Sequence, residues 1–184
     1  VNFIRFILEE LLPPILRDSI LFKYLVKYAY RNDYAHETLK ENILNISKKD
    51  YIKYYEDIPE IQGETDNSRE CIEEIIKEIV PNDVIDVGCG RGYLLNQIML
   101  SNPSLKLYGS EIFKSDKLKL YEKNFKFTIF EKGIEDLVSI NKSFDTVICT
   151  HVLEHVLDIQ SAFQNLKKIC KKKLIIVVPK ERPY

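Results

Sequence analysis

The sequence predicts an α/β protein with a doubly wound, mostly parallel sheet and an N-terminal helical extension. From Ser68 onward, helix-like patterns alternate with short apolar runs, and a glycine-rich turn follows the first run. The last run, residues 174–178, is apolar at every position, as in a strand that is covered on both faces. Such alternation is typical of parallel strands with helices on both sides of one sheet.

The predicted extension covers residues 1–67. Apolar residues recur there at helical spacing up to about residue 30, and Pro13-Pro14 interrupts them, so we expect two helices with a break between them. Residues 31–67 are polar and rich in tyrosine, which favours short helices and loops. We therefore expect residues 1–67 to form a cap and residues 68–184 to form the core.

Helices and strands are expected to alternate along most of the core. A helix over residues 68–79 has Ile72, Ile75 and Ile76 on one face, and Pro81 follows its end. Strands are expected at residues 84–87, 106–109, 125–130, 146–149 and 174–178. Further helices are expected at residues 93–101, 115–124 and 158–170.

Composition and charge bear on the class of partner. Lys and Arg number 27 against 28 Asp and Glu, so the chain lacks the overall basic charge of a nucleic-acid-binding protein. The four cysteines form no CxxC pair, which argues against a zinc knuckle and a disulfide framework and favours the reducing cytoplasm. Charges interrupt the N-terminal apolar stretch, which argues against a signal peptide or a spanning helix. Contact of residues 1–30 with a membrane surface is a weaker alternative.

The glycine-rich turn is the segment with the clearest chemistry. Gly88, Gly90 and Gly92 follow a strand and precede a helix, where free backbone amides and the helix dipole attract a carboxylate or a phosphate. The G-x-G-x-G spacing differs from the G-x-G-x-x-G of dinucleotide-binding loops, and Asp86 lies directly before it. An acid beside an amide cradle suits a zwitterion, such as the methionine end of S-adenosylmethionine (SAM), better than a pyrophosphate.

Residues 84–95, VIDVGCGRGYLL, resemble the first motif of the class I SAM-dependent methyltransferases, particularly the type 11 and type 12 domain families. The resemblance covers residues 70–183 and leaves the first seventy residues unexplained. It implies a Rossmann-like fold, SAM as the methyl donor and S-adenosylhomocysteine as the product. It also implies a donor-binding role for five residues of the first motif: Asp86, Gly88, Cys89, Gly90 and Gly92.

Two further segments resemble donor contacts of the same family. Glu111 follows the second strand, where relatives carry an acid that binds the ribose hydroxyls, and Ile112 aligns with an apolar adenine contact. Many relatives have an Asp where Gly133 aligns, so we expect the backbone of Ile134 and the side chain of Glu135 to serve the adenine amino group instead.

Residues 144–156 resemble the fourth strand of the family and the turn after it, which implies that Thr150 and His151 lie beside the reactive sulfonium. His151 is the candidate general base because its ordinary pKa lies near neutrality, and His155 is a weaker candidate. Some relatives hold a divalent cation in this turn, so His151, Glu154 and His155 form a weaker alternative metal site, whereas no metal is the main expectation. The H-x-x-E-H pattern of zinc proteases also matches but requires a helix-borne site.

The sequence therefore predicts a SAM-dependent methyltransferase that acts at oxygen or nitrogen of a small-molecule or glycan-like acceptor. Tyr51, Tyr54 and Tyr55 are expected near that acceptor. A non-catalytic module that binds SAM or its product is the main alternative, and a nucleotide-dependent oxidoreductase is the third. The family fold continues beyond a fifth strand, so we expect either that the chain is shortened there or that a partner covers that strand.

Overall fold

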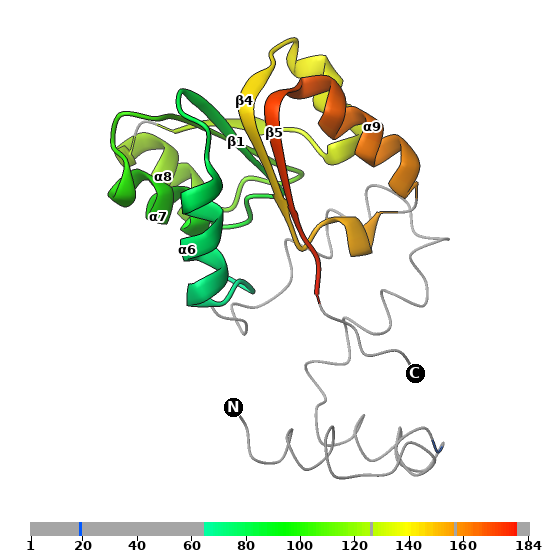
Figure 1. Cartoon of the computed structure of the whole chain (residues 1–184), viewed down its shortest axis with the longest axis horizontal. Helices are drawn as coiled ribbons and strands as arrows, with labels where there is room; N and C mark the ends of the chain where they lie inside the picture. Colours follow the sequence, from blue (N-terminus) through cyan, green and yellow to red (C-terminus); the bar gives the residue numbers. More distant parts are fainter. Residues whose placement is uncertain (1–18, 20–64, 126, 157, 180–184) are drawn as a thin grey trace. The chain divides into compact units, whose positions relative to one another are not determined.

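The computed structural model describes Ser19 and residues 65–125, 127–156 and 158–179. The described part after residue 64 contains a five-stranded sheet with the strand order β3-β2-β1-β4-β5 (Figure 1). Every pairing between neighbouring strands is parallel. The strands are β1 (Asp83–Val87), β2 (Lys106–Glu111), β3 (Thr128–Glu131), β4 (Phe144–Thr150) and β5 (Cys170–Val177). The predicted doubly wound parallel fold is confirmed.

Helices cover both faces of this sheet. Figure 1 shows α6, α7 and α8 on one side and α9 on the other. The helical segments are α6 (Arg69–Glu78), α7 (Tyr93–Ser101), α8 (Asp116–Phe125), α9 (Ile159–Ile169) and the 3-10 turns η3 (Ile134–Ile140) and η4 (Leu153–His155). Because the strand order reverses between β1 and β4, the loops that follow these strands diverge and leave room for a ligand at their carboxyl ends.

Alternate side chains of the central strands enter two separate cores. Val84 of β1 packs in the core under α6, α7 and α8, whereas Ile85 packs in the core under η3 and α9. In β4, Ile148 belongs to the first core and Val147 to the second. This two-sided burial explains why apolar residues occupy adjacent positions in the central strands.

The structure departs from the predicted elements most clearly at three places. Phe125, expected to begin the third strand, ends α8, and its ring packs on Tyr121 at 5.3 Å between ring centroids. Segment η3, for which no helix was expected, buries Ile134 and Leu137. Strand β5 begins at Cys170 rather than at residue 174, since Lys172 forms an ion pair with Asp145 of β4 at 3.1 Å. An aromatic residue at the end of α8 and lysines at the start of β5 therefore account for the errors in these two predicted boundaries.

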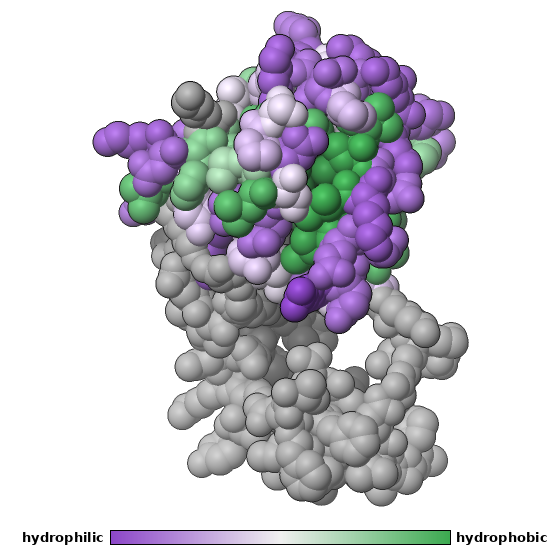
Figure 2. Space-filling model, turned by 60° about the vertical axis from the view of Figure 1, so that its left-hand side comes forward, coloured by the Kyte–Doolittle hydropathy of each residue, from purple (hydrophilic) through white to green (hydrophobic). Residues whose placement is uncertain are grey.

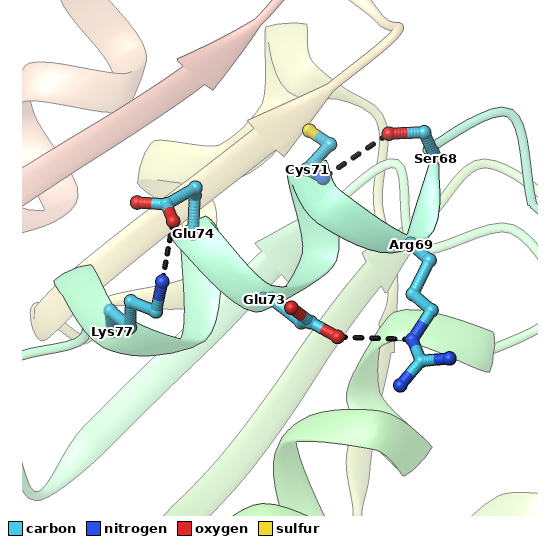
Figure 3. A network of polar contacts seen from close by, with 6 residues as sticks. All are labelled: Ser68, Arg69, Cys71, Glu73, Glu74 and Lys77. Atoms are coloured by element: carbon cyan, nitrogen blue, oxygen red, sulfur yellow. Dashed lines mark hydrogen bonds and ion pairs between the residues drawn. The ribbon is translucent and has the colours of Figure 1, made fainter.

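Helix α6 brings the chain into the core, and its start matches the prediction. The Ser68 hydroxyl accepts a hydrogen bond from the backbone N–H of Cys71 at 3.2 Å and so caps the first turn (Figure 3). Arg69 pairs with Glu73 at 3.0 Å on the exposed face of the helix. Such exposed pairs stabilise little, so the cap and the buried isoleucines hold this helix in place.

The surface of the described part is largely hydrophilic on the face drawn in Figure 2, and a band of hydrophobic side chains crosses it. Among the described strands, β5 pairs with β4 and with no other. The residues of β5 from Leu174 to Val177 are half-buried, and Val178 is exposed. Whether a further segment or a partner covers this strand stays a prediction.

Several predictions lie outside the described residues. They concern the two N-terminal helices, the membrane-surface alternative for residues 1–30 and the tyrosines Tyr51, Tyr54 and Tyr55. The chain divides into two compact units, residues 1–46 and 47–184, and the boundary expected after residue 67 stays a prediction. Of the helices that the structure describes, none has the length and apolar character needed to cross a membrane.

Candidate donor and acceptor site

The glycine loop after β1 has a backbone that side chains would disfavour. Gly88, Gly90 and Gly92 have φ values of 73°, 53° and 81°, in the left-handed region that favours glycine. A Cβ atom at Gly88 would lie 2.2 Å from Cγ2 of Val152, whereas one at Gly90 would meet nothing within 4 Å. The loop therefore packs tightly against the segment after β4 and leaves open space at Gly90.

The end of β2 fixes this loop through hydrogen bonds. The carbonyl of Ser110 accepts the N–H groups of Gly88 at 2.7 Å and of Cys89 at 3.2 Å. The Glu111 carboxylate accepts the N–H of Gly90 at 2.7 Å through Oε2 and that of Ile112 at 2.8 Å through Oε1. A single carboxylate thus connects the loop after β1 to the loop after β2.

Asp86 is a buried carboxyl group beneath the same loop. It is 2% exposed, and its Oδ1 has no hydrogen-bond partner among the described residues. Burial, and secondarily the nearby charge of Glu111, raises the pKa of Asp86 from 3.8 to about 8. Burial also raises the pKa of Glu111, against its two backbone hydrogen bonds. Two carboxyl groups with unfavourable ionisation suit a cationic ligand, which would stabilise their charged forms.

The residues expected around adenine lie close together. A Cβ atom at Gly133 would lie 2.8 Å from Oε2 of Glu135 and 3.2 Å from Cγ1 of Ile112. The Glu135 carboxylate therefore occupies the space that a side chain at position 133 would take. Ile134 is 5% exposed and its side chain belongs to the core, so a backbone contact of this residue with the ligand stays a prediction. Asn165 of α9 donates hydrogen bonds to the carbonyls of Ile134 at 3.2 Å and Glu135 at 3.1 Å.

The turn after β4 holds the predicted catalytic residues. Thr150, the last residue of β4, is 8% exposed and accepts a hydrogen bond from Nδ2 of Asn67 at 3.2 Å. His151 has a φ of 55°, and its N–H donates to the carbonyl of Val177 at 3.0 Å. Its Nδ1 lies 3.5 Å from Oε1 of Glu154. The backbone and Glu154 thus restrict His151 at the carboxyl end of the sheet.

The zinc-protease pattern and the divalent-cation alternative for this turn can both be compared with the structure. Glu154 and His155 lie on the short 3-10 turn η4, not on the long helix that the zinc-protease pattern requires. Within residues 65–125, 127–156 and 158–179, no three His, Cys, Asp or Glu side chains are arranged to hold a metal ion. The metal-free site stays the main prediction.

Two asparagines at this edge escaped sequence reasoning. Asn67 precedes the capping serine of α6, and its partner Thr150 is 83 positions away. Asn165 is a partly buried residue of α9 and donates to backbone carbonyls 30 and 31 positions away. No local pattern marks either residue, because only the folded sheet brings the partners together.

Comparison with known families identifies the domain. A family model described as a methyltransferase domain matches residues 59–181. The chain belongs to this family, which is a class I SAM-dependent methyltransferase family. The resemblance predicted from residues 84–95 is confirmed.

Curated relatives carry a more specific name. The chain is 30% identical over 111 residues to the ubiquinone biosynthesis O-methyltransferase of Rickettsia bellii (strain OSU 85-389). The aligned region covers 59% of this chain and 46% of the relative. The chain is also 30% identical over 116 residues to the protein of the same name in Rickettsia prowazekii (strain Madrid E), covering 58% and 46%. The chain thus spans less than half the length of these relatives.

Solved structures share the fold of this methyltransferase domain. Magnesium protoporphyrin IX methyltransferase from Synechocystis PCC 6803, solved with bound SAM, matches with a TM-score of 0.54 and 19% identity over 73% of this chain and 78% of its own. N-methyltransferase NodS from Bradyrhizobium japonicum WM9, solved with S-adenosylhomocysteine, matches with a TM-score of 0.51 and 15% identity over 68% and 69%. At these identities the likeness supports the fold alone.

Proposed function

We propose that this domain binds SAM above the carboxyl ends of β1 and β2. The observation that carries the proposal is the glycine loop, which the Glu111 carboxylate connects to the next loop while Asp86 lies buried beneath it. Asp86 attracts the amino group of the methionine end, and the free amides at the start of α7 bind its carboxylate. Glu111 retains acceptor capacity for the ribose hydroxyls, since each carboxylate oxygen has two lone pairs.

The remaining predicted donor contacts complete this site. Ile112 covers one face of the adenine ring, and the backbone of Ile134 with the Glu135 carboxylate recognises its polar edge. Gly133 leaves room for that carboxylate. Cys89, which is buried, lines the loop from below. These roles rest on the membership of the family and on the proximity of the residues.

The proposed reaction is methyl transfer to a hydroxyl group of a small molecule. The acceptor oxygen attacks the methyl carbon in line, the bond between that carbon and the sulfonium sulfur breaks, and S-adenosylhomocysteine leaves as a neutral thioether. His151 receives the hydroxyl proton, because it lies at the end of β4 with Glu154 at its Nδ1. Alignment of donor and acceptor supplies much of the acceleration.

The class of acceptor rests on the relatives. They are named ubiquinone biosynthesis O-methyltransferases, which favours a hydroxyl on a small aromatic molecule over a nitrogen or a glycan-like acceptor. The family membership gives no support to a nucleic-acid acceptor, which the balanced charge also disfavours. All four cysteines are free thiols, which supports a reducing compartment such as the cytoplasm.

Two measurements test this proposal in sequence. Calorimetry with SAM, S-adenosylhomocysteine and NAD should give binding of the first two ligands and none of NAD. Transfer of a radiolabelled methyl group from SAM to a panel of catechols, amines and oligosaccharides should then label the catechols. SAM binding without transfer to any acceptor would contradict the enzyme and support the non-catalytic module. Binding of NAD alone would contradict both.

A further inference from the structure

Asn67 connects the segment before α6 and the first turn of α6 to the distant end of β4. Its backbone N–H donates to Oγ1 of Thr65 at 3.1 Å, which forms a local turn. Its Nδ2 donates to Oγ1 of Thr150 at 3.2 Å, at the end of β4. Its Oδ1 accepts a hydrogen bond from Sγ of Cys71 in α6 at 3.5 Å. This side chain therefore fixes the segment before α6 against the carboxyl end of the sheet.

The backbone that follows Thr150 depends on such support. His151 adopts a left-handed conformation, with a φ of 55°, which costs a residue other than glycine free energy unless its surroundings impose it. The carbonyl of Val177 in β5 fixes His151 from one side by accepting its N–H at 3.0 Å. Asn67 fixes the preceding residue from the side of α6.

Asn67 is not needed to begin α6. The hydroxyl of Ser68 already caps this helix by accepting the N–H of Cys71 at 3.2 Å. The amide of Asn67 is directed instead toward β4, 83 positions along the chain. A role in helix initiation therefore does not account for the contact with Thr150.

We infer that Asn67 is a positioning residue for the methyl-acceptor side of the site. By holding the Thr150 hydroxyl, it sets the turn that carries His151, and it places residues 65–68 beside the end of β4. The inference rests on the proposed function. Because the proposed donor contacts come mainly from the loops after β1 and β2, a change at Asn67 affects the acceptor much more than SAM.

The kinetic test compares Asn67→Ala, Asn67→Asp and Thr150→Val with the control Arg69→Ala. Loss of one hydrogen bond predicts that Asn67→Ala lowers kcat/KM for the catechol about 3- to 10-fold, while its Kd for SAM changes less than about 2-fold. Asn67→Asp should restore most of the rate, since an aspartate accepts a hydrogen bond from the Thr150 hydroxyl. Arg69→Ala, whose side chain is 88% exposed, should match the wild type.

The double variant Asn67→Ala/Thr150→Val should be no slower than the slower single variant, because both substitutions remove the same hydrogen bond. Amide hydrogen exchange over residues 150–156 gives a second readout that needs no acceptor. Exchange should be faster in Asn67→Ala and Thr150→Val and unchanged in Arg69→Ala. Additive kinetic losses, or exchange at the wild-type rate in Asn67→Ala, would overturn the inference. A wild-type protein that fails to bind SAM would instead contradict the proposed function.

Discussion

The loop after β1 and the turn after β4 lie at the same edge of the sheet but are held in different ways. In the first, glycines at positive φ define the shape, and the end of β2 holds the loop: the Ser110 carbonyl accepts the N–H groups of Gly88 and Cys89, and the Glu111 carboxylate accepts that of Gly90. In the second, His151 has a positive φ without being a glycine; Val177 and Glu154 contact it, and Asn67 holds the preceding residue, Thr150. The backbone of the donor loop thus depends on its own glycines, whereas the unusual backbone of the acceptor turn has no glycine at His151 and depends on its partners.

This difference indicates how the two halves of the site respond to change. A glycine loop is disturbed when one of its own glycines is replaced, because a side chain disfavours the positive φ at that position. A turn that distant side chains hold can be altered from 83 positions away.

The largest effect is expected for Gly88→Val. The new Cβ atom would lie 2.2 Å from Cγ2 of Val152, and the φ of 73° disfavours a branched side chain, so the loop must shift. We expect the free energy of unfolding to fall by about 2–4 kcal/mol and SAM binding to be lost. Gly90→Val is the matched control, since Gly90 also has a positive φ but a Cβ atom there would meet nothing within 4 Å. Equal losses in the two variants, measured by denaturant unfolding, would refute the role of Val152.

A pH dependence is expected from Asp86. Its pKa is raised from 3.8 to about 8 by burial and by Glu111, so between these pH values the folded protein keeps a proton that the unfolded chain has lost. Stability should therefore fall as the pH rises through this window, by up to about 1.4 kcal/mol per unit, and level off above it.

SAM affinity should change in the opposite direction to stability. A cationic ligand favours the ionised carboxylate, so the affinity should rise with pH until Asp86 has lost its proton. Asp86→Asn should flatten both profiles, measured by unfolding and calorimetry from pH 5 to 9. A variant that keeps the wild-type profiles would assign the dependence to another group.

An intermediate loss of SAM affinity is expected for Gly133→Ala. The added methyl group would lie 2.8 Å from Oε2 of Glu135, at the end of a flexible side chain that can move away at little cost to stability. If this carboxylate contacts adenine, SAM affinity should fall about 3- to 10-fold with little change in the unfolding midpoint. Glu135→Gln should show a similar loss. Full affinity in both variants would leave the backbone of Ile134 as the adenine contact.

The smallest effect is expected away from the site, at the cap of α6. Ser68→Ala removes the oxygen that accepts the N–H of Cys71, so stability should fall by about 1 kcal/mol. Arg69→Ala, which removes an exposed ion pair to Glu73, should cost less than about 0.5 kcal/mol. Neither variant should alter the affinity for SAM. A reduced affinity in Arg69→Ala would show that α6 contributes to the donor site.

Sequence reasoning succeeded where a short segment contains its own physical cause. The strand, glycines and helix of residues 84–95 predict the loop, and apolar periodicity predicts the parallel sheet. It failed for Phe125, where aromatic residues at a helix end read as a strand, and for β5, whose lysines need ion pairs with Asp145 and Glu78 to join the sheet. Asn67 was missed because its partner, Thr150, is likewise distant in the sequence.

The donor site depends on Glu111, and calorimetric titration with SAM tests this most directly. Glu111→Gln keeps the size of the side chain but leaves either Gly90 or Ile112 without a carboxylate oxygen. Glu131→Gln is the matched control, because Glu131 is exposed and lies in register with Glu111 on the neighbouring strand. We predict that the wild type and Glu131→Gln bind SAM equally and that Glu111→Gln binds at least about 10-fold more weakly. Equal affinity in all three proteins, or no binding by the wild type, would contradict the account.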